Sequence, residues 1–328
     1  MPQNLENKKR LVKLLSKLAL KVGAKFIVEP EWGRAAQLIF PNGVVRSFLG
    51  YLLDLNGAAS SGISTDKSHA KFFMKTKGYP VAPGQTIFED SWAKEMKSNR
   101  KIPYAVKYAK HFGYPLIVKP NSKSQGSGVS LVYDKSELAV ALREIFKEDK
   151  VAIMEKYLPG RDYRIVVLDG EMISVYERVP LSVTGDGRRS ILALLQRKIY
   201  FLRKEGYKID LKDRRIKLKL KHASYTFKNI LSKNEKIYLL DNANLSSGGD
   251  MIDASKTISA GFKKIAIQLT KDMGLRFSGV DIMITRGDIT KNPKACNYYI
   301  IEINSSPGLA PAKTKYLKIL KALARTPN

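Results

Sequence analysis

Two apolar segments near the C-terminal end of the chain are predicted to be β-strands that carry polar side chains. They are Gly279–Ile284 and Tyr298–Asn304. Because side chains alternate along a strand, Glu302 and Asn304 should share one face of the second strand. Asp281 interrupts the first strand, where an unpaired carboxylate would be costly to bury. Two carboxylates and an amide oxygen suit Mg²⁺, which prefers hard oxygen ligands, although the carboxylates alone fit ion-paired sheet residues equally well.

The rest of the chain alternates between helical and strand patterns. Apolar residues recur at helical spacing over residues 5–22, 67–77, 101–112, 136–146 and 260–273. Strand patterns cover residues 25–29, 37–40, 44–48, 116–120, 129–133, 151–154, 163–168, 172–178 and 236–240. The small residues of Asn56–Gly62 predict a connector and a candidate domain boundary. A chain of 328 residues is long enough to arrange these elements in two or three subdomains.

The composition narrows the class of protein. Hydrophobic residues make up 44% of the chain and charged residues 27%, as in a soluble globular protein. The longest apolar runs are far shorter than the ~20 residues that cross a bilayer, and the N-terminus lacks the apolar core of a signal peptide. Cys296 is the only cysteine, so neither an intrachain disulfide nor a cysteine-based zinc site can form. We therefore expect a cytoplasmic protein without a membrane partner.

The chain is strongly basic. Its 58 lysine and arginine residues outnumber 30 acidic residues, which gives a formal net charge of +28. Such an excess favours anionic partners such as nucleotides, acidic peptides or nucleic acid. The basic residues are spread through segments such as KKRLVKLLSKLALK and RRIKLKLKH and form no basic tail. A solvated, lysine-rich surface explains this distribution better than a nucleic-acid site, so we do not expect nucleic acid as a partner.

A loop rich in glycine and serine lies between two predicted strands. Residues Asn121–Gly128 connect Leu116–Pro120 to Val129–Tyr133. A P-loop would need GxxxxGK[ST] leading into a helix, and a dinucleotide fingerprint would also need a helix after it, so neither motif is present. Lys119 stands at the end of the first strand between a valine and a proline, which is a poor place for an ordinary surface lysine.

Several motifs in a fixed order resemble those of the ATP-grasp superfamily. They are VKP with the glycine/serine loop, MEKYLPGRDYRIVVLDG, RVPLSVTGDG, NANLSSGGDMID, FSGVDIMI and IIEINSSPG. Within this superfamily the chain most resembles the ligase domain of cyanophycin synthetases and of bifunctional glutathione synthetases, from about Asp66 to Leu309. The resemblance implies an α+β ATP-grasp fold in which two α+β subdomains clamp ATP.

The resemblance also implies how the chain is divided. Residues 66–309 would form the ATP-grasp ligase domain, with the subdomain that carries the glycine/serine loop at about 101–160. Residues 1–65 would form a short N-terminal α/β region, and residues 310–328 a C-terminal helix and tail. The first 65 residues are too few for the large N-terminal domains of those enzymes, and no room is left for the second domain of a cyanophycin synthetase. We therefore do not expect their products to carry over with the fold.

ATP-grasp enzymes activate a carboxylate as an acylphosphate, which an amine attacks to give an amide or peptide bond, ADP and phosphate. The resemblance therefore implies an ATP-dependent carboxylate–amine ligase for an amino acid or peptide. It also implies ATP and Mg²⁺, with two ions expected and Mn²⁺ able to substitute. One alternative is a ligase that adds amino acids to an acidic protein or polymer, which the charge would favour. Another is a non-catalytic nucleotide- or RNA-binding protein on a ligase fold, and we also consider a homodimer.

The resemblance assigns roles to individual residues. Lys119 and Arg178 would be catalytic, because a lysine suits the ATP phosphates and a guanidinium suits a carboxylate or acylphosphate. The nucleotide would be bound by Lys67, Lys119, Ser124, Gln125, Gly126, Ser127, Gly128, Glu155, Lys156, Tyr157, Leu158 and Asp162. Mg²⁺ would be bound by Asp281, Glu302 and Asn304. The acyl donor and acceptor would be bound by Arg188, Asn242, Asn244 and Ser306.

Two observations leave the substrate open. Each arginine or asparagine in the substrate group is equally well interpreted as a solvent-facing or turn-forming residue. Related loops often carry a histidine near Gln125, and this loop has none. This departure bears on substrate preference more than on catalysis.

Overall fold

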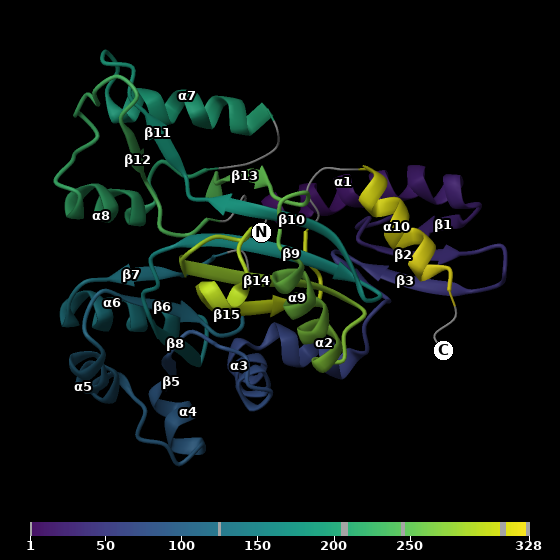
Figure 1. The fold of residues 1–328 in the computed structure, drawn as a ribbon, viewed down its shortest axis with the longest axis horizontal. Coiled ribbons are helices and arrows are strands. Elements are labelled where there is room, and N and C mark those ends of the chain that lie inside the picture. The colour runs from purple at the N-terminus through teal and green to yellow at the C-terminus, as the bar shows by residue number, and fades with distance from the viewer. Residues whose placement is uncertain (1, 124–125, 205–208, 244–246, 309–312, 326–328) are drawn as a thin grey trace.

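The computed structural model describes residues 2–123, 126–204, 209–243, 247–308 and 313–325. Four β-sheets and the helices around them make up this part of the chain (Figure 1). The predicted loop residues Ser124 and Gln125 and the predicted substrate residue Asn244 lie outside the described residues.

A five-stranded antiparallel sheet lies at the centre of the molecule, in the order β13-β10-β9-β14-β15 (Figure 1). Its strands are β9 (Arg161–Leu168), β10 (Glu171–Val179), β13 (Asp250–Asp253), β14 (Phe277–Arg286) and β15 (Asn297–Asn304). One face of this sheet is apolar and packs against helix α9 (Ala260–Asp272), with Tyr163, Ile165, Val280 and Ile282 in the shared core.

The opposite face of the central sheet changes from apolar to polar along its strands. Val166, Leu168 and Phe277 on this face are buried in a core shared with the N-terminal region. Because side chains alternate, Arg164 and Asp281 follow them on the same face. The N-terminal region therefore covers the apolar half of this face and leaves the polar half for other contacts.

A second antiparallel sheet has the order β5-β8-β6-β7 and comprises β5 (Gly84–Phe88), β6 (Leu116–Pro120), β7 (Ser130–Val132) and β8 (Val151–Lys156). Its core is closed by α5 (Ile102–Phe112) and α6 (Lys135–Phe146), which contribute buried residues such as Ala105 and Leu138. Helix α6 is capped by Asp134, whose carboxylate accepts hydrogen bonds from two backbone N–H groups of the first turn. The short helix α4 (Asp90–Glu95) follows β5.

The N-terminal region forms a third sheet in which each strand pairs with the next, from β1 to β4. The strands are β1 (Lys25–Val28), β2 (Ala35–Ile39), β3 (Val45–Leu49) and β4 (Leu52–Leu53). Helix α1 (Pro2–Ala19) and the C-terminal helix α10 (Lys313–Leu323) lie beside this sheet (Figure 1). Leu15 and Leu18 of α1 share a core with Ile319 and Leu320 of α10, so the two ends of the chain pack together.

A small unit with its own core is inserted between β10 and β13. It contains β11 (Ser182–Thr184), α7 (Ile191–Lys204), α8 (Arg214–His222) and β12 (Lys236–Tyr238). The two strands pair antiparallel, and Leu195 of α7 and Ile216 of α8 are buried beneath them.

One predicted element is wrong. The segment Asn56–Gly62 is predicted to be a connector, but Ala58–Thr65 forms helix α2, which contacts β15. Asn56 also fixes this segment, since its side chain donates to the carbonyls of Phe277 and Ser305 and accepts from two backbone N–H groups of β14 and its approach. The small residues of this segment allow α2 to pack closely against the central sheet.

The other predicted helices and strands are present within a few residues of their expected limits, and the α+β class is confirmed. Helix α3 (Lys67–Thr76), for example, begins at the first residue of the predicted helical pattern, and the side chain of Asp66 caps it. The division into residues 1–65, 66–309 and 310–328 stays a prediction. No helix among the described residues is long and apolar enough to cross a membrane.

Candidate active site

A cleft is lined jointly by the β5-β8-β6-β7 sheet and the polar half of the central sheet. It holds about 940 Å³ of empty space, counting the part open to solvent. Its walls include most of the predicted residues: Lys67, Lys119, Gly126, Ser127, Glu155, Lys156, Tyr157, Leu158, Asp162, Arg178, Asn242, Asp281 and Glu302. The fold therefore brings into one cleft residues that are far apart in the sequence.

Four predicted residues lie near the cleft or away from it. Gly128 has a φ of 73°, and a Cβ there would lie 3.1 Å from a proline ring, so glycine is needed to shape the turn. Asn304 is adjacent to Glu302, with Nδ2 donating to Oε1 at 3.1 Å. Ser306 is half-buried after the end of β15, and Arg188 lies in an exposed turn.

A buried ion cluster links the second sheet to helix α3. Lys119 on β6 contacts Glu155 on β8 with Nζ–Oε2 at 2.7 Å, and the two side chains are 7% and 5% exposed. Lys71 of α3 contacts the other carboxylate oxygen at 2.5 Å. Burial would raise the pKa of Glu155, but Lys119 and Lys71 outweigh it and hold the pKa below its usual value. Both oxygens of Glu155 are therefore already engaged, so a nucleotide could use them only by sharing.

Lys67 ties the start of α3 to the segment that follows β6. Its ammonium group donates to the carbonyl of Asn121 at 3.3 Å and also to that of Lys123. Asp66, the residue that caps α3, accepts from the Asn121 amide at 2.6 Å. Burial lowers the pKa of Lys67, and Glu302 opposes this effect from across the cleft. Lys67 therefore lies where the glycine/serine loop begins.

Asp281 on β14 is held by two arginines. Nε and Nη2 of Arg164 on β9 contact its two oxygens, both at 2.6 Å. Arg178 on β10 contacts it at 2.9 Å and also contacts Asp162 at 2.7 Å. Glu302 lies 3.6 Å from Arg164. The polar half of the central sheet is thus a network of two guanidinium groups among three carboxylates.

The two candidate metal carboxylates differ in their electrostatic environment. Burial raises the pKa of Asp281 to about 6, although Arg164 and Arg178 oppose it. Burial would also raise the pKa of Glu302, but Lys67 and Arg164 are among the cations that outweigh it and hold the pKa at about 2. Glu302 is therefore firmly ionised at neutral pH, as a metal ligand must be.

The donor set fits Mg²⁺. Asp281 and Glu302 are register partners on β14 and β15, and Asn304 shares a face with Glu302, as the alternation predicts. Two carboxylates and one amide oxygen leave several positions of an octahedral shell for water and phosphate, which Mg²⁺ favours. Glu302 and Asn304 are the less engaged donors, since Arg164 and Arg178 occupy the oxygens of Asp281. Among the described residues no group of three or more acidic, histidine or cysteine side chains is placed to hold a metal ion, so the proposed set depends on the amide oxygen of Asn304 beside two carboxylates.

Sequence reasoning missed Arg164 and Lys71. Lys71 follows Lys67 by four residues, so helical spacing places both on one face of α3 and could have identified it. Arg164 lies directly opposite Asp281 in the register of β9 and β14. The sequence alone does not state which strands pair, so this contact had no signal in it.

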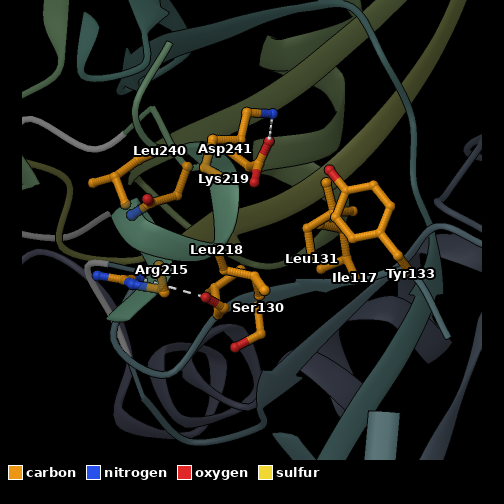
Figure 2. A pocket seen from close by; sticks show the side chains of 11 residues that line it. Ile117, Ser130, Leu131, Tyr133, Arg215, Leu218, Lys219, Leu240 and Asp241 are labelled. Atoms are coloured by element: carbon orange, nitrogen blue, oxygen red, sulfur yellow. Dashed lines mark hydrogen bonds and ion pairs between the residues drawn. The ribbon is translucent and has the colours of Figure 1, made fainter. Parts of the chain in front are cut away.

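A smaller cavity adjoins the cleft on the side of helix α8 (Figure 2). It shares Ile117, Val129, Asp241 and Asn242 with the cleft. Figure 2 shows Leu131 and Tyr133 on one side of it and Arg215 and Leu218 on another. Lys219 and Asp241 form an ion pair at its edge.

Two family models match the chain in succession. The model of the D-ala D-ala ligase C-terminus matches residues 73–186, and the model of the RimK-like ATP-grasp domain matches residues 240–325. The crystal structure of a bifunctional glutathione synthetase from Pasteurella multocida is similar over 87% of this chain and 38% of its own, with a TM-score of 0.52 and 25% identity. The fold and the cleft therefore define an ATP-grasp protein, as the resemblance of its motifs implies.

Curated relatives agree with this class. The glutathione biosynthesis bifunctional protein of Enterococcus faecalis is 32% identical over 75% of this chain and 32% of its own length. The cyanophycin synthetase of Trichormus variabilis is 31% identical over 78% of this chain and 28% of its own. The chain belongs to the ATP-grasp superfamily. It spans a third or less of the length of these two relatives.

Proposed function

We propose that the protein is an ATP-dependent carboxylate–amine ligase. The γ-phosphoryl group of ATP would pass to a substrate carboxylate, giving ADP and an acylphosphate. An amine would then attack the acyl carbon, forming an amide or peptide bond and releasing phosphate. The observation that carries this proposal is the cleft itself, which presents Lys67 and Lys119 from one side and Arg178 and the carboxylates Asp281 and Glu302 from the other.

The nucleotide would lie across the C-terminal end of β8 and the residues that follow it. Backbone groups of Lys156, Tyr157 and Leu158 would bind the adenine edge, and Asp162 would bind the ribose hydroxyls. The ammonium groups of Lys67 and Lys119 would contact the phosphates, where charge-assisted hydrogen bonds are strong. The backbone of Gly126, Ser127 and Gly128 would pack over them, with Ser124 and Gln125 completing the loop.

Asp281, Glu302 and Asn304 would hold Mg²⁺, with two ions expected and Mn²⁺ able to substitute. The metal would neutralise charge on the phosphates during phosphoryl transfer. The chain's own contribution is to keep these carboxylates ionised and in place, which Arg164 and Lys67 do from neighbouring positions. Arg178 suits the reacting oxygens because its Nε is buried without a hydrogen-bond partner in the described part of the chain. A carboxylate or acylphosphate oxygen that reached Nε would satisfy it.

The substrate would be an amino acid or peptide, bound with the help of Arg188, Asn242, Asn244 and Ser306. A specific observation favours a second candidate, since the net charge of +28 would attract an acidic protein or polymer as the acceptor. We place the reaction in the cytoplasm, and a homodimer is the assembly to test first.

A phosphate-release screen over amino acids and dipeptides, with ATP and Mg²⁺, tests this function. Ligation would release phosphate only when a matching carboxylate and amine are both present, and mass spectrometry would detect the amide. Binding of ATP without product from any pair would support a nucleotide-binding protein on a ligase fold instead. The Glu302→Gln variant serves as the control, because it removes a proposed metal ligand and should release no phosphate.

A further inference from the structure

Two faces of helix α8 contact other parts of the protein. Ile216 and Leu220 are buried in the core of the small inserted unit. Arg215, Lys219 and His222 lie on another face, since they are spaced by three or four residues along the helix. This second face meets the β5-β8-β6-β7 sheet and its surroundings, so part of the basic segment RRIKLKLKH is engaged in contacts and is not simply a solvated surface.

Side chains on this second face of α8 contact residues of the β5-β8-β6-β7 sheet region, which forms one wall of the cleft. His222 lies 3.0 Å from Glu137 of α6, and its ring stacks on Tyr133 with centroids 3.8 Å apart. Lys219 pairs with Asp241 at the edge of the smaller cavity (Figure 2). At the N-terminal end of the helix, Arg215 reaches the turn at the C-terminal end of the glycine/serine loop.

Arg215 holds this turn by its backbone. Its Nη1 donates to the carbonyl of Gly126 at 3.1 Å and to that of Val129 at 3.4 Å. The turn is also closed on itself, because the Val129 N–H donates to the Gly126 carbonyl at 3.3 Å. The rest of the guanidinium is oriented by Asp213, which accepts from Nη2 at 2.7 Å and from Nε at 3.0 Å. One side chain from the inserted unit therefore fixes both ends of the turn.

The turn needs such support. Gly126 and Gly128 have φ values of 70° and 73°. Glycine adopts this conformation readily, but it adopts many others as well, so glycine alone does not hold the turn in one conformation. Fixing the backbone of each residue costs conformational entropy, so a turn that became ordered only on a ligand would weaken binding of that ligand by this cost. Gly126, Ser127 and Val129 line the cleft, so a turn fixed beforehand presents an ordered wall to the phosphates.

We infer that Arg215 is a positioning residue for the triphosphate: it pre-orders the Gly126–Val129 turn from the inserted unit. This inference rests on the proposed function, in which the turn packs over the ATP phosphates. Asn242, a proposed substrate residue, belongs to the same inserted region and lines both cavities. Arg215 thus connects the substrate side of the cleft to the phosphate side.

Calorimetric titration with two nucleotides in the presence of Mg²⁺ tests the inference: a non-hydrolysable ATP analogue with an imido β–γ bridge, and AMP. Arg215→Ala should weaken the triphosphate analogue about tenfold, the effect of losing the ordered hydrogen bonds, and leave AMP unchanged. Arg214→Ala is the matched control, because it removes the same charge from an exposed neighbour on the same helix. Arg215→Lys keeps the charge and can reach one carbonyl, so its affinity for the analogue should be intermediate.

Three results would overturn the inference. Arg215→Ala could bind the analogue as Arg214→Ala does, it could lose AMP and the analogue equally, or Arg215→Lys could match wild type. If Arg215→Ala does not fold, the Arg215→Lys comparison decides alone. Lys119→Ala separates this inference from the proposed function: if that variant keeps full affinity for the analogue, the proposed nucleotide site is wrong whatever Arg215 does.

Discussion

The guanidinium of Arg164 on β9 forms a bidentate ion pair with the carboxylate of Asp281 on β14, with Nε–Oδ1 and Nη2–Oδ2 both at 2.6 Å. The two residues are register partners, and the Asp281 side chain is only 1% exposed. Breaking a buried ion pair from one side is strongly destabilising, and removal of Arg164 would leave Asp281 with Arg178 as its remaining arginine contact.

Arg164→Gln should therefore lower the free energy of unfolding by about 3 kcal/mol, as measured by urea denaturation. The matched control is Arg161→Gln on the same strand, whose partner is Glu177 and whose side chain is 51% exposed. Because solvent screens the half-exposed Arg161 guanidinium, this pair should contribute less than the Arg164–Asp281 pair, about 1 kcal/mol. Equal losses in the two variants would mean that the Arg164–Asp281 pair is not a main support of the site.

Glu155 predicts a pH dependence of stability. Lys119 and Lys71 hold its pKa below the usual value despite burial, so it contributes stability that is present above its unfolded pKa of about 4.3. This stability is lost as the pH falls through the folded-state pKa. Glu155→Gln should thus be less stable than wild type at pH 7, and the difference should shrink below about pH 4. Glu144→Gln, an exposed carboxylate on α6, should show no such trend. A difference that stays constant with pH would contradict the ionised cluster.

Variants of Lys119 and Lys71 distinguish a contact with the nucleotide from a contribution to packing. Both pair with Glu155, but only Lys119 lines the cleft. Lys119→Ala should weaken binding of a non-hydrolysable ATP analogue by about 1.5–3 kcal/mol, because it removes a charge-assisted contact. Lys71→Ala should lose stability with a smaller effect on affinity. Calorimetric titration measures both, and equal affinities in the two variants would exclude a direct phosphate contact by Lys119.

The net charge of +28 predicts how the KM for the acceptor substrate depends on salt concentration. If the surface recruits an acidic chain, the attraction should weaken as the Debye length falls from ~10 Å at 0.1 M salt to ~3 Å at 1 M. The KM for an acidic oligopeptide should then rise along a KCl series, while the KM for a neutral dipeptide and for ATP should change less. Equal salt dependence for both acceptors would leave the charge as an aid to solubility.

The sequence predicts the site to the extent that its chemistry is local. Alternation along one strand places Glu302 and Asn304 together, and the strand-end position of Lys119 marks it as unusual. Contacts that depend on strand pairing were not predictable. Arg164 and Asp281 are 117 residues apart in the sequence, and Arg215 and Gly126 are 89 residues apart. They are in contact only because of how the strands and α8 are arranged in the fold.

The helix at Ala58–Thr65 shows a different limit. Its serines and glycine have a lower helix propensity than its alanines and indicate a connector, whereas packing against β15 and the hydrogen bonds of Asn56 fix the segment. Tertiary contacts decide the local structure here, and composition alone does not record them.

The central claim is that a substrate carboxylate is activated as an acylphosphate in this cleft. The most direct measurement uses the carboxylate substrate found by the phosphate-release screen, labelled with ¹⁸O in both carboxylate oxygens. One labelled oxygen should bond to the γ-phosphorus, and it should leave with the phosphate when the amine attacks the acyl carbon. We predict one ¹⁸O in each released phosphate, with no release by Glu302→Gln. Released phosphate that carries no label, alongside amide product, would contradict the proposed reaction.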